Sequence, residues 1–135
     1  MSLSHGIDMV DCRRLRELID RYGERFLHRI FSRRELEYCL GKKREIEHLS
    51  GRFAAKEAVL KLLGTGLRRG MSWTEIEILN EPSGQPRVHL SGRCRQIADE
   101  RNLEEIVVSI SHIETHAIAS AVASARQFGA LGNPR

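Results

Sequence analysis

Two carboxylates stand among apolar neighbours, where an acidic side chain is costly. Asp8 lies within the segment 6–10, Gly-Ile-Asp-Met-Val, and Glu57 lies within the segment 53–60, Phe-Ala-Ala-Lys-Glu-Ala-Val-Leu. An ionised carboxylate taken out of water costs several kcal/mol unless a positive group compensates it. Two such acids from different elements can share one hard cation, and carboxylate oxygens completed by water suit Mg²⁺ with its attached phosphates. The alternatives are an ion pair of either acid with Arg or Lys, or a position at a partly exposed helix edge.

Cations and glycines follow Glu57 closely. Lys61 lies four residues later, so the two side chains share one helix face. The turn Gly64-Thr65-Gly66 comes next, followed by Arg68 and Arg69. Glycines let successive backbone N–H groups turn toward an anion, and nearby cations neutralise it. This combination suggests a site for a metal-bound pyrophosphate, although Gly64 alone is also typical of a helix C-cap. The spacing does not match a P-loop, which excludes a P-loop nucleotide triphosphatase.

These side chains can meet only if two elements bring them together. Residues 7–12 are expected to form a first strand that carries Asp8. Residues 46–63 are expected to form the longest helix, and its apolar residues cover most of its circumference, which is typical of a buried helix. The candidate site therefore requires this strand to pack against this helix.

Apolar spacing, caps and turn residues predict the remaining elements. These are a helix over 13–21 ended by Gly23, a short apolar helical stretch over 26–31, a helix from the capping box at Ser32 and Glu35 to Leu40, strands over 73–79 and 87–90, a helix over 91–101, and a hairpin over 105–113 and 116–124. The fold class is α+β: a single domain over 1–124, with a mostly antiparallel sheet packed against one long buried helix and shorter helices. Residues 125–135 are expected to form a mobile tail.

The composition fits one compact domain. The chain has 135 residues, of which 41% are hydrophobic and 30% charged, and no stretch approaches the roughly 20 apolar residues that span a bilayer. The N-terminus lacks the basic and apolar regions of a secretory signal. The three cysteines, Cys12, Cys39 and Cys94, are far apart and odd in number, which argues against a disulfide framework. We therefore expect a cytoplasmic protein without a membrane partner.

The first third of the chain is basic. Residues 12–44 carry 11 Lys and Arg against five Asp and Glu, whereas the whole chain has a net charge of +4. Such a surface attracts an anionic partner: nucleic acid, an acidic protein or a phosphorylated small molecule. A solvated helical face is the simpler alternative. Seven aromatic residues, without an aromatic strand of the ribonucleoprotein type, argue against nucleic acid.

The motifs together resemble those of the holo-[acyl-carrier-protein] synthases, the small group of 4′-phosphopantetheinyl transferases. The resemblance rests on the segment 6–10, on Arg52-Phe53-Ala54-Ala55-Lys56-Glu57-Ala58 with Lys61, and on Gly64-Thr65-Gly66. Gly84-Gln85-Pro86 and Ser109-Ile110-Ser111-His112 match later blocks of the family in the same order, so the resemblance covers residues 5–124.

The resemblance implies a Mg²⁺-dependent enzyme of fatty acid biosynthesis. It would move the 4′-phosphopantetheine group of coenzyme A to a serine of apo-acyl carrier protein and release adenosine 3′,5′-bisphosphate. Asp8 and Glu57 would be the metal ligands, and Glu57 or a metal-held water would take the serine proton. Lys61 would stabilise charge on the pyrophosphate. Larger relatives have a third acid where Val10 stands, and the small group completes the metal shell with water.

The resemblance also implies a coenzyme A site. Its residues would be Arg52, Lys61, Gly64, Thr65, Gly66, Pro86, Arg87 and His112. Gln85 stands where relatives often have Lys, and Arg87 could replace that cation. For His112, a place near coenzyme A, a role as a base and a hydrogen-bonded structural role all stay open.

An acidic carrier protein would dock on the basic surface, and the family implies homotrimers with active sites shared between subunits. The docking residues would be Arg13, Arg14, Arg16, Arg21 and Arg25. The small residues that alternate over 117–123 permit close approach of a helix or a neighbouring subunit, or simply tight internal packing. The alternatives to an enzyme are a basic nucleic-acid-binding domain and a non-catalytic trimeric scaffold of the same fold.

Overall fold

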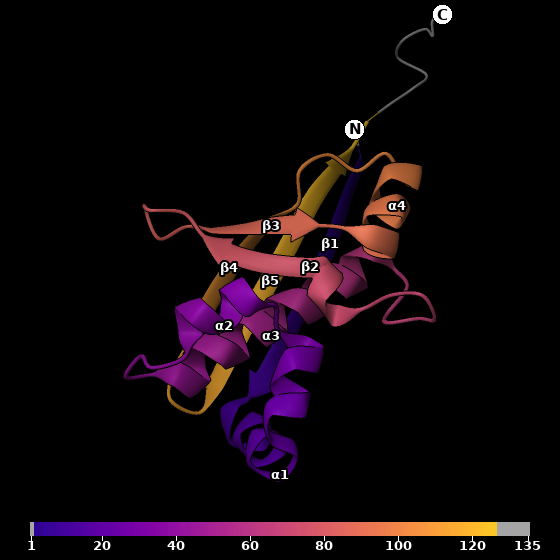
Figure 1. Ribbon diagram of the computed structural model, residues 1–135. Helices are drawn as coiled ribbons and strands as arrows, with labels where there is room; N and C mark the ends of the chain where they lie inside the picture. The colour runs from indigo at the N-terminus through magenta and orange to yellow at the C-terminus, as the bar shows by residue number, and fades with distance from the viewer. Residues whose placement is uncertain (1, 127–135) are drawn as a thin grey trace, which may run out of the picture.

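The computed structural model describes residues 2–126 as one α+β domain (Figure 1). Its elements, in chain order, are β1 (Ser2–Asp11), α1 (Cys12–Ile30), α2 (Arg33–Cys39), α3 (Glu45–Leu63), the 3₁₀ turn η1 (Trp73–Glu75), β2 (Ile76–Asn80), β3 (Pro86–Leu90), α4 (Gly92–Glu100), β4 (Val107–His112) and β5 (His116–Ala125). Within the described residues, no helix is both long enough and apolar enough to cross a membrane.

Helix α3 lies between two antiparallel sheets. One sheet has the order β1-β5-β4, and the other is the hairpin β2-β3. Figure 1 shows α3 between the three-stranded sheet and this hairpin, with α1 and α2 beside it. The predicted antiparallel pairing and the single buried helix are confirmed, because α3 is apolar around most of its circumference and is covered on all these sides.

Small residues let α3 approach the three-stranded sheet closely. The four alternate alanines of β5 are buried beneath α3, which decides between the alternatives for this stripe in favour of helix packing. On β1, a Cβ added to Gly6 would lie 2.0 Å from the carbonyl oxygen of Ala58 in α3. Only glycine fits at this contact, and Asp8 follows two residues later on the same face of the strand.

A buried ion pair connects α3 to α2 and β2. The Nζ of Lys56 lies 2.8 Å from Oε1 of Glu35, and both side chains are fully buried. Lys56 also donates to the carbonyl oxygens of Trp73 and Ile76. Glu35 accepts hydrogen bonds from the backbone N–H groups of Ser32 (2.8 Å) and Ile78 (2.7 Å). The capping box predicted at Ser32 and Glu35 is therefore present, and its acid also reaches the second sheet.

Some element bounds differ from expectation. β1 begins at Ser2 because its full length pairs with β5, and it ends where Asp11 caps α1 by accepting the N–H groups of Arg13 and Arg14. Gly23 interrupts α1 with φ 62°, as its predicted role as a helix end requires. In the predicted tail, Ala125 still pairs in β5 and Arg126 donates to the Asn102 carbonyl; the rest of the tail lies outside the described residues.

The segment Trp73–Glu75 was expected to begin a strand, and this prediction is wrong. It forms the turn η1, because Lys56 takes the carbonyl oxygen of Trp73 and the N–H of Glu75 donates to the Ser72 carbonyl. The Glu75 carboxylate accepts the N–H of Cys94 at 3.1 Å, so the turn also holds the start of α4.

Candidate functional site

The predicted meeting of Asp8 and Glu57 occurs at the edge of the three-stranded sheet. Asp8 projects from β1 and Glu57 from α3, and their half-buried carboxyl groups lie within hydrogen-bond distance of each other. Lys61, one helical turn beyond Glu57, donates to Oδ1 of Asp8 at 2.8 Å and to the Ile7 carbonyl at 3.0 Å. The close contact at Gly6 brings strand and helix together at this point.

The electrostatics of this cluster favour an added cation. Burial, the hydrogen bond with Asp8 and repulsion from its charge raise the pKa of Glu57 to about 8, while Lys61 opposes the shift. For Asp8, burial raises the pKa, but hydrogen bonds from Glu57 and Lys61 leave it below its ordinary value. Two adjacent carboxyl groups share one ammonium group, so a second negative charge is unfavourable and Glu57 keeps its proton at neutral pH. A divalent cation would supply the missing positive charge and accept oxygen ligands from both acids.

The described residues contain no cluster of three or more His, Cys, Asp and Glu side chains that could hold a metal. The acid pair therefore fits the predicted mode of binding, in which water supplies the remaining ligands. Hard divalent cations such as Mg²⁺ commonly keep several waters and are held by one or two carboxylates.

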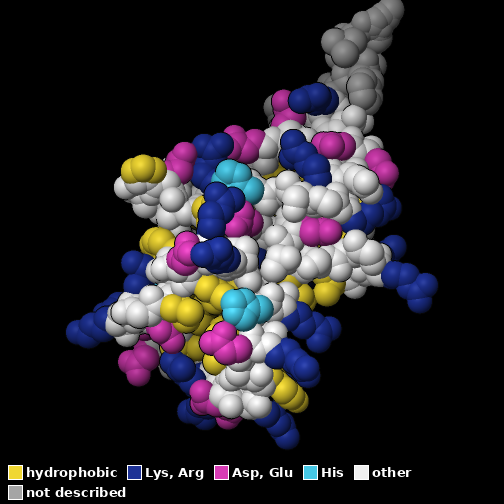
Figure 2. Space-filling model, viewed as in Figure 1, with side chains coloured by type: hydrophobic (Ala, Val, Ile, Leu, Met, Phe, Trp, Pro, Cys, Tyr) yellow, Lys and Arg dark blue, Asp and Glu magenta, His cyan; other side chains and the backbone are white. Residues whose placement is uncertain are grey.

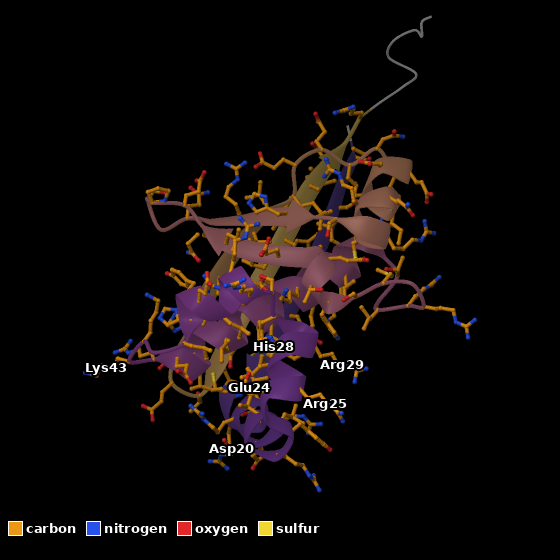
Figure 3. All side chains as sticks on the ribbon, in the orientation of Figure 1. Asp20, Glu24, Arg25, His28, Arg29 and Lys43 are labelled. Atoms are coloured by element: carbon orange, nitrogen blue, oxygen red, sulfur yellow. The ribbon has the colours of Figure 1, made fainter. Side chains whose placement is uncertain are left out.

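The acid pair opens into a cavity of about 260 Å³. Arg14 lies at this cavity, and Leu15, Leu18 and Phe53 form its apolar wall. Arg14 belongs to the predicted docking surface, all five of whose arginines are exposed on α1. Figure 2 shows basic side chains around the end of the molecule formed by α1, interleaved with acidic ones, and Arg25 points outward from that helix in Figure 3. The basic surface and the acid pair are thus continuous.

A second group of predicted residues lies at the other edge of the same sheet. Arg52, Pro86 and His112 line a cavity of about 190 Å³, together with Glu47, His48, Tyr38 and Asn80. β1 and β4 are the two edge strands, with β5 between them. Asp8 of the acid pair, on β1, and His112, on β4, therefore lie at opposite edges of the same sheet.

The remaining predicted coenzyme A residues lie apart from both cavities. Gly64 ends α3 in the left-handed conformation, which confirms its reading as a C-cap, and the Thr65 carbonyl accepts a hydrogen bond from Arg68 at 3.0 Å. Arg87 forms ion pairs with Glu81 (2.9 Å) and Glu105 (3.1 Å). Its charge is thus already matched by two acids.

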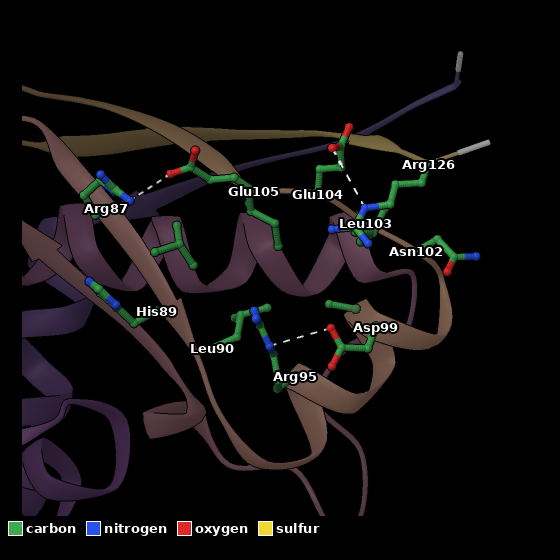
Figure 4. A pocket seen from close by; sticks show the side chains of 13 residues that line it. Arg87, His89, Leu90, Arg95, Asp99, Asn102, Leu103, Glu104, Glu105 and Arg126 are labelled. Carbon is green, nitrogen blue, oxygen red and sulfur yellow. Dashed lines mark ion pairs between the residues drawn. The ribbon is translucent and has the colours of Figure 1, made fainter. Parts of the chain in front are cut away.

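A larger cavity than either of these, of about 530 Å³, lies between β3, α4 and the segment before β4 (Figure 4). Its arginines are paired with acids: Arg87 with Glu105, Arg95 with Asp99 at 3.7 Å, and Arg126 with Glu104 at 4.0 Å. Because these charges cancel, the cavity presents no surplus charge to a ligand. Size alone does not mark the site in this molecule.

Sequence reasoning missed the acid beside His112. Glu47 is buried, and its Oε1 lies 2.7 Å from Nδ1 of His112. In the sequence it looks like an ordinary acid in the first turn of a helix, where negative charge is favourable. Asn80, which accepts a hydrogen bond from Arg52, ends a strand and gave no signal either. Only the packing of α3 against β4 and β2 reveals these contacts.

Comparison with known proteins gives one consistent result. A model of the 4′-phosphopantetheinyl transferase superfamily matches residues 4–121. Holo-[acyl-carrier-protein] synthase of Protochlamydia amoebophila is 45% identical over 122 residues, which are 90% of this chain and 98% of that protein. The same enzyme of Geotalea daltonii is 44% identical over 117 residues, covering 87% of this chain and 94% of that protein.

Solved structures agree. The crystal structure of holo-[acyl-carrier-protein] synthase from Neisseria meningitidis superposes with a TM-score of 0.81 at 30% identity, covering 90% of this chain and 97% of that one. The Helicobacter pylori enzyme in complex with coenzyme A gives a TM-score of 0.78 at 33% identity and covers 89% of this chain and 99% of that one.

Proposed function

The chain belongs to the holo-[acyl-carrier-protein] synthases of the 4′-phosphopantetheinyl transferase superfamily, and from this premise we propose the reaction that it performs. It transfers the 4′-phosphopantetheine group of coenzyme A to a serine of apo-acyl carrier protein, releases adenosine 3′,5′-bisphosphate, and so serves fatty acid biosynthesis. The observation that carries this proposal is the meeting of Asp8 and Glu57 beside Lys61, at a cavity that Arg14 also borders.

Asp8 and Glu57 are the residues that would hold Mg²⁺. The bound ion would neutralise the pyrophosphate and stabilise charge on the leaving oxygen. Lys61 now donates to Asp8 from an exposed position, and its ammonium group can turn to the pyrophosphate when the substrate is bound. Transfer of a phosphoryl-type group depends mainly on such positioning and charge neutralisation.

The bond changes are those of one displacement. The serine Oγ of the carrier protein forms a bond to the phosphorus that bears the pantetheine arm. The bond from this phosphorus to the bridging oxygen breaks, and its electron pair leaves with adenosine 3′,5′-bisphosphate. Glu57, or a water beside it, takes the serine proton, a step that contributes roughly 10²- to 10⁴-fold to the rate.

The basic face of α1 is the proposed carrier-protein surface. Its five arginines are exposed, and Arg14 connects this surface to the cavity of the acid pair. An acidic partner would therefore approach with its serine near Glu57. A basic nucleic-acid-binding role, the alternative from composition, gives no reason for two carboxylates to meet at that surface.

We propose a homotrimer for the assembly. The sheet face opposite α3 carries apolar side chains that are exposed in the isolated chain: Leu3, Ile7, Met9, Val107, Ile118 and Val122. Burial of this face by further copies would bring the β4 edge of one subunit to the β1 edge of the next. A coenzyme A molecule could then contact Lys61 of one subunit and Arg52 and His112 of another.

A cytoplasmic location follows from the same function and is supported by the cysteines. Cys12, Cys39 and Cys94 are free and buried. Burial is the main cause that raises the pKa of the Cys39 thiol to about 11 and of Cys94 to about 12. Thiols held in this form are poor nucleophiles, which agrees with their predicted inert role.

The decisive experiment incubates the protein with coenzyme A, Mg²⁺ and an apo-acyl carrier protein. We expect the carrier protein to gain the mass of one 4′-phosphopantetheine group, and chelation of divalent cations to stop the reaction. No mass gain with a carrier protein that a related synthase modifies would favour the non-catalytic scaffold instead.

A further inference from the structure

Glu47 is a buried acid that the proposed reaction does not use. It lies in the first turns of α3 and is 7% exposed, yet no Lys or Arg forms an ion pair with it among residues 2–126. Its described partner is His112, at the end of β4, with 2.7 Å between Glu47 Oε1 and His112 Nδ1. A carboxylate that is nearly out of water needs such a partner, so the contact fixes both side chains.

The ring of His112 is held from a second side as well. The imidazole of His48 packs edge-on against it, with 5.6 Å between ring centroids, and Tyr38 packs edge-on against His48 at 5.9 Å. With Nδ1 directed at Glu47, the other ring nitrogen, Nε2, is left for a ligand. His112 and Glu47 both line the cavity of about 190 Å³.

The same cavity contains an arginine that is only partly satisfied. Arg52 is 4% exposed, donates from Nη2 to Asn80 and lies over the Tyr38 ring at 4.3 Å. Its Nε is buried and has no hydrogen-bond partner among the described residues. Burial is the main cause that lowers the pKa of His48, and the nearby Arg52 and His112 add to the shift. A buried, unpaired guanidinium donor beside two imidazoles suits an anionic group.

We propose that Glu47 is a positioning residue, which accepts the Nδ1–H of His112 so that the Nε2–H of the same ring donates to the anionic part of coenzyme A beside Arg52. This inference rests on the proposed function, because coenzyme A is the anion that the reaction supplies. Glu47 contacts no substrate itself. It fixes the orientation of the His112 ring, and its negative charge favours the form with a proton on both ring nitrogens, the only form that can donate to Glu47 and to an anion together.

The test measures coenzyme A binding apart from turnover. Glu47→Gln keeps the shape of the side chain but removes its charge, and we expect the Kd for coenzyme A by calorimetry to rise about tenfold, the size of one charge-assisted hydrogen bond. The KM for coenzyme A should rise similarly, while kcat and the KM for carrier protein change little. Glu45→Gln is the matched control: it removes a charge two residues away on the same helix, from a side chain that binds the Gly41 N–H instead.

A double-substitution cycle separates positioning from general damage. If Glu47 acts through His112, Glu47→Gln should have no further effect on the Kd in a His112→Ala background. An equal effect in both backgrounds, or an unchanged Kd in the single variant, overturns the proposal.

The wild-type protein offers an independent readout should Glu47→Gln not fold. In the complex with coenzyme A, nitrogen-15 chemical shifts of the His112 ring should show a proton on both nitrogens, because Nδ1–H donates to Glu47 and Nε2–H donates to the anion. A ring nitrogen without a proton contradicts the proposal. Wild-type protein that binds coenzyme A but transfers nothing would refute the proposed function and leave this inference standing. If the wild-type protein is active and Glu47→Gln binds coenzyme A normally, the proposed function stands and this inference is refuted.

Discussion

Helix α3 carries two lysines, five residues apart, with opposite fates. Lys56 is fully buried, paired with one carboxylate, Glu35, and bonded to two backbone carbonyls. Lys61 is more than half exposed and shares a cluster with two carboxylates, Asp8 and Glu57. The first cluster is balanced in charge and closed to solvent, and its acid is satisfied by N–H groups as well. The second has two acids for one ammonium group, so that Glu57 keeps its proton at neutral pH, and it opens into a cavity.

The comparison shows how a structural ion pair can be distinguished from an ionic cluster that can bind a ligand. Burial lowers the pKa of Lys56, and the charge of Glu35 opposes this shift. Each side chain of the pair therefore needs the charge of the other to stay ionised. A complete pair of this kind has no bond left to offer a ligand. An incomplete cluster at a surface does, because both of its acids can be ionised together only if positive charge is added from outside the chain.

The largest expected effect comes from the open cluster. Glu57→Gln should lower the transfer rate about 10²- to 10⁴-fold, because it removes a proposed metal ligand and one of the two proposed proton acceptors. The melting temperature should not fall, since the substitution also relieves repulsion with Asp8. Rates by mass spectrometry and melting by calorimetry check both parts. A large loss of melting temperature would break the distinction between the two clusters.

The closed cluster should respond in the opposite way. Lys56→Met leaves Glu35 buried without its partner and should cost about 3–5 kcal/mol of unfolding free energy. Urea titration followed by circular dichroism measures this loss. The double variant Lys56→Met, Glu35→Leu should be more stable than Lys56→Met alone. If it is not, the instability has a cause other than the unpaired acid.

Gly6→Ala should affect both stability and activity. A methyl group there meets the Ala58 carbonyl, so β1 and α3 must separate, at about 1–3 kcal/mol. The separation also moves Asp8 from Glu57, and we expect a higher Mg²⁺ concentration for half-maximal activity. Gly41→Ala is the control: nothing lies within 4 Å of its added Cβ, and its φ of 84° makes the substitution cost stability at a place away from Asp8 and Glu57. Equal magnesium dependence in both variants would contradict the role given to Gly6.

Glu77, an acid outside both clusters, gives a pH-dependent contrast. Burial raises its pKa, but hydrogen bonds from Arg34 and Ser32 outweigh this and leave the pKa below its ordinary value of 4.5. Its contribution to stability is therefore fully present above that value and is lost as the pH falls through the lower folded pKa. The stability difference between wild type and Glu77→Gln should shrink as acid is added. A difference independent of pH would show that the charge of Glu77 contributes nothing.

The smallest effect is expected at the exposed surface of α1. Arg14→Glu should raise the KM for carrier protein a few-fold, and less at high salt, with the Kd for coenzyme A unchanged. Arg33→Glu on α2 is a control for the change in net charge. If both reversals act equally, attraction is general and no docking surface on α1 is needed.

The features that could be predicted from the sequence are those that depend on local residue patterns. Asp8 and Glu57 were visible because acids stood in apolar segments, and the capping box at Ser32 was visible because its two residues are three apart. Glu47 and Asn80 were not, because their partners lie in other elements, and a single sequence does not give the register of α3 against β4. The strand expected from Trp73 failed for the same reason: the lysine that takes its carbonyl is 17 residues earlier.

The opposite placement of the two cavities has a consequence for regulation by abundance. If neighbouring copies share their active sites as proposed, a single chain contains part of two active sites and no complete one. Newly made subunits would then be silent until they find one another. Specific activity would fall on dilution. In the cell, total activity would rise more steeply than in proportion to the concentration of this protein.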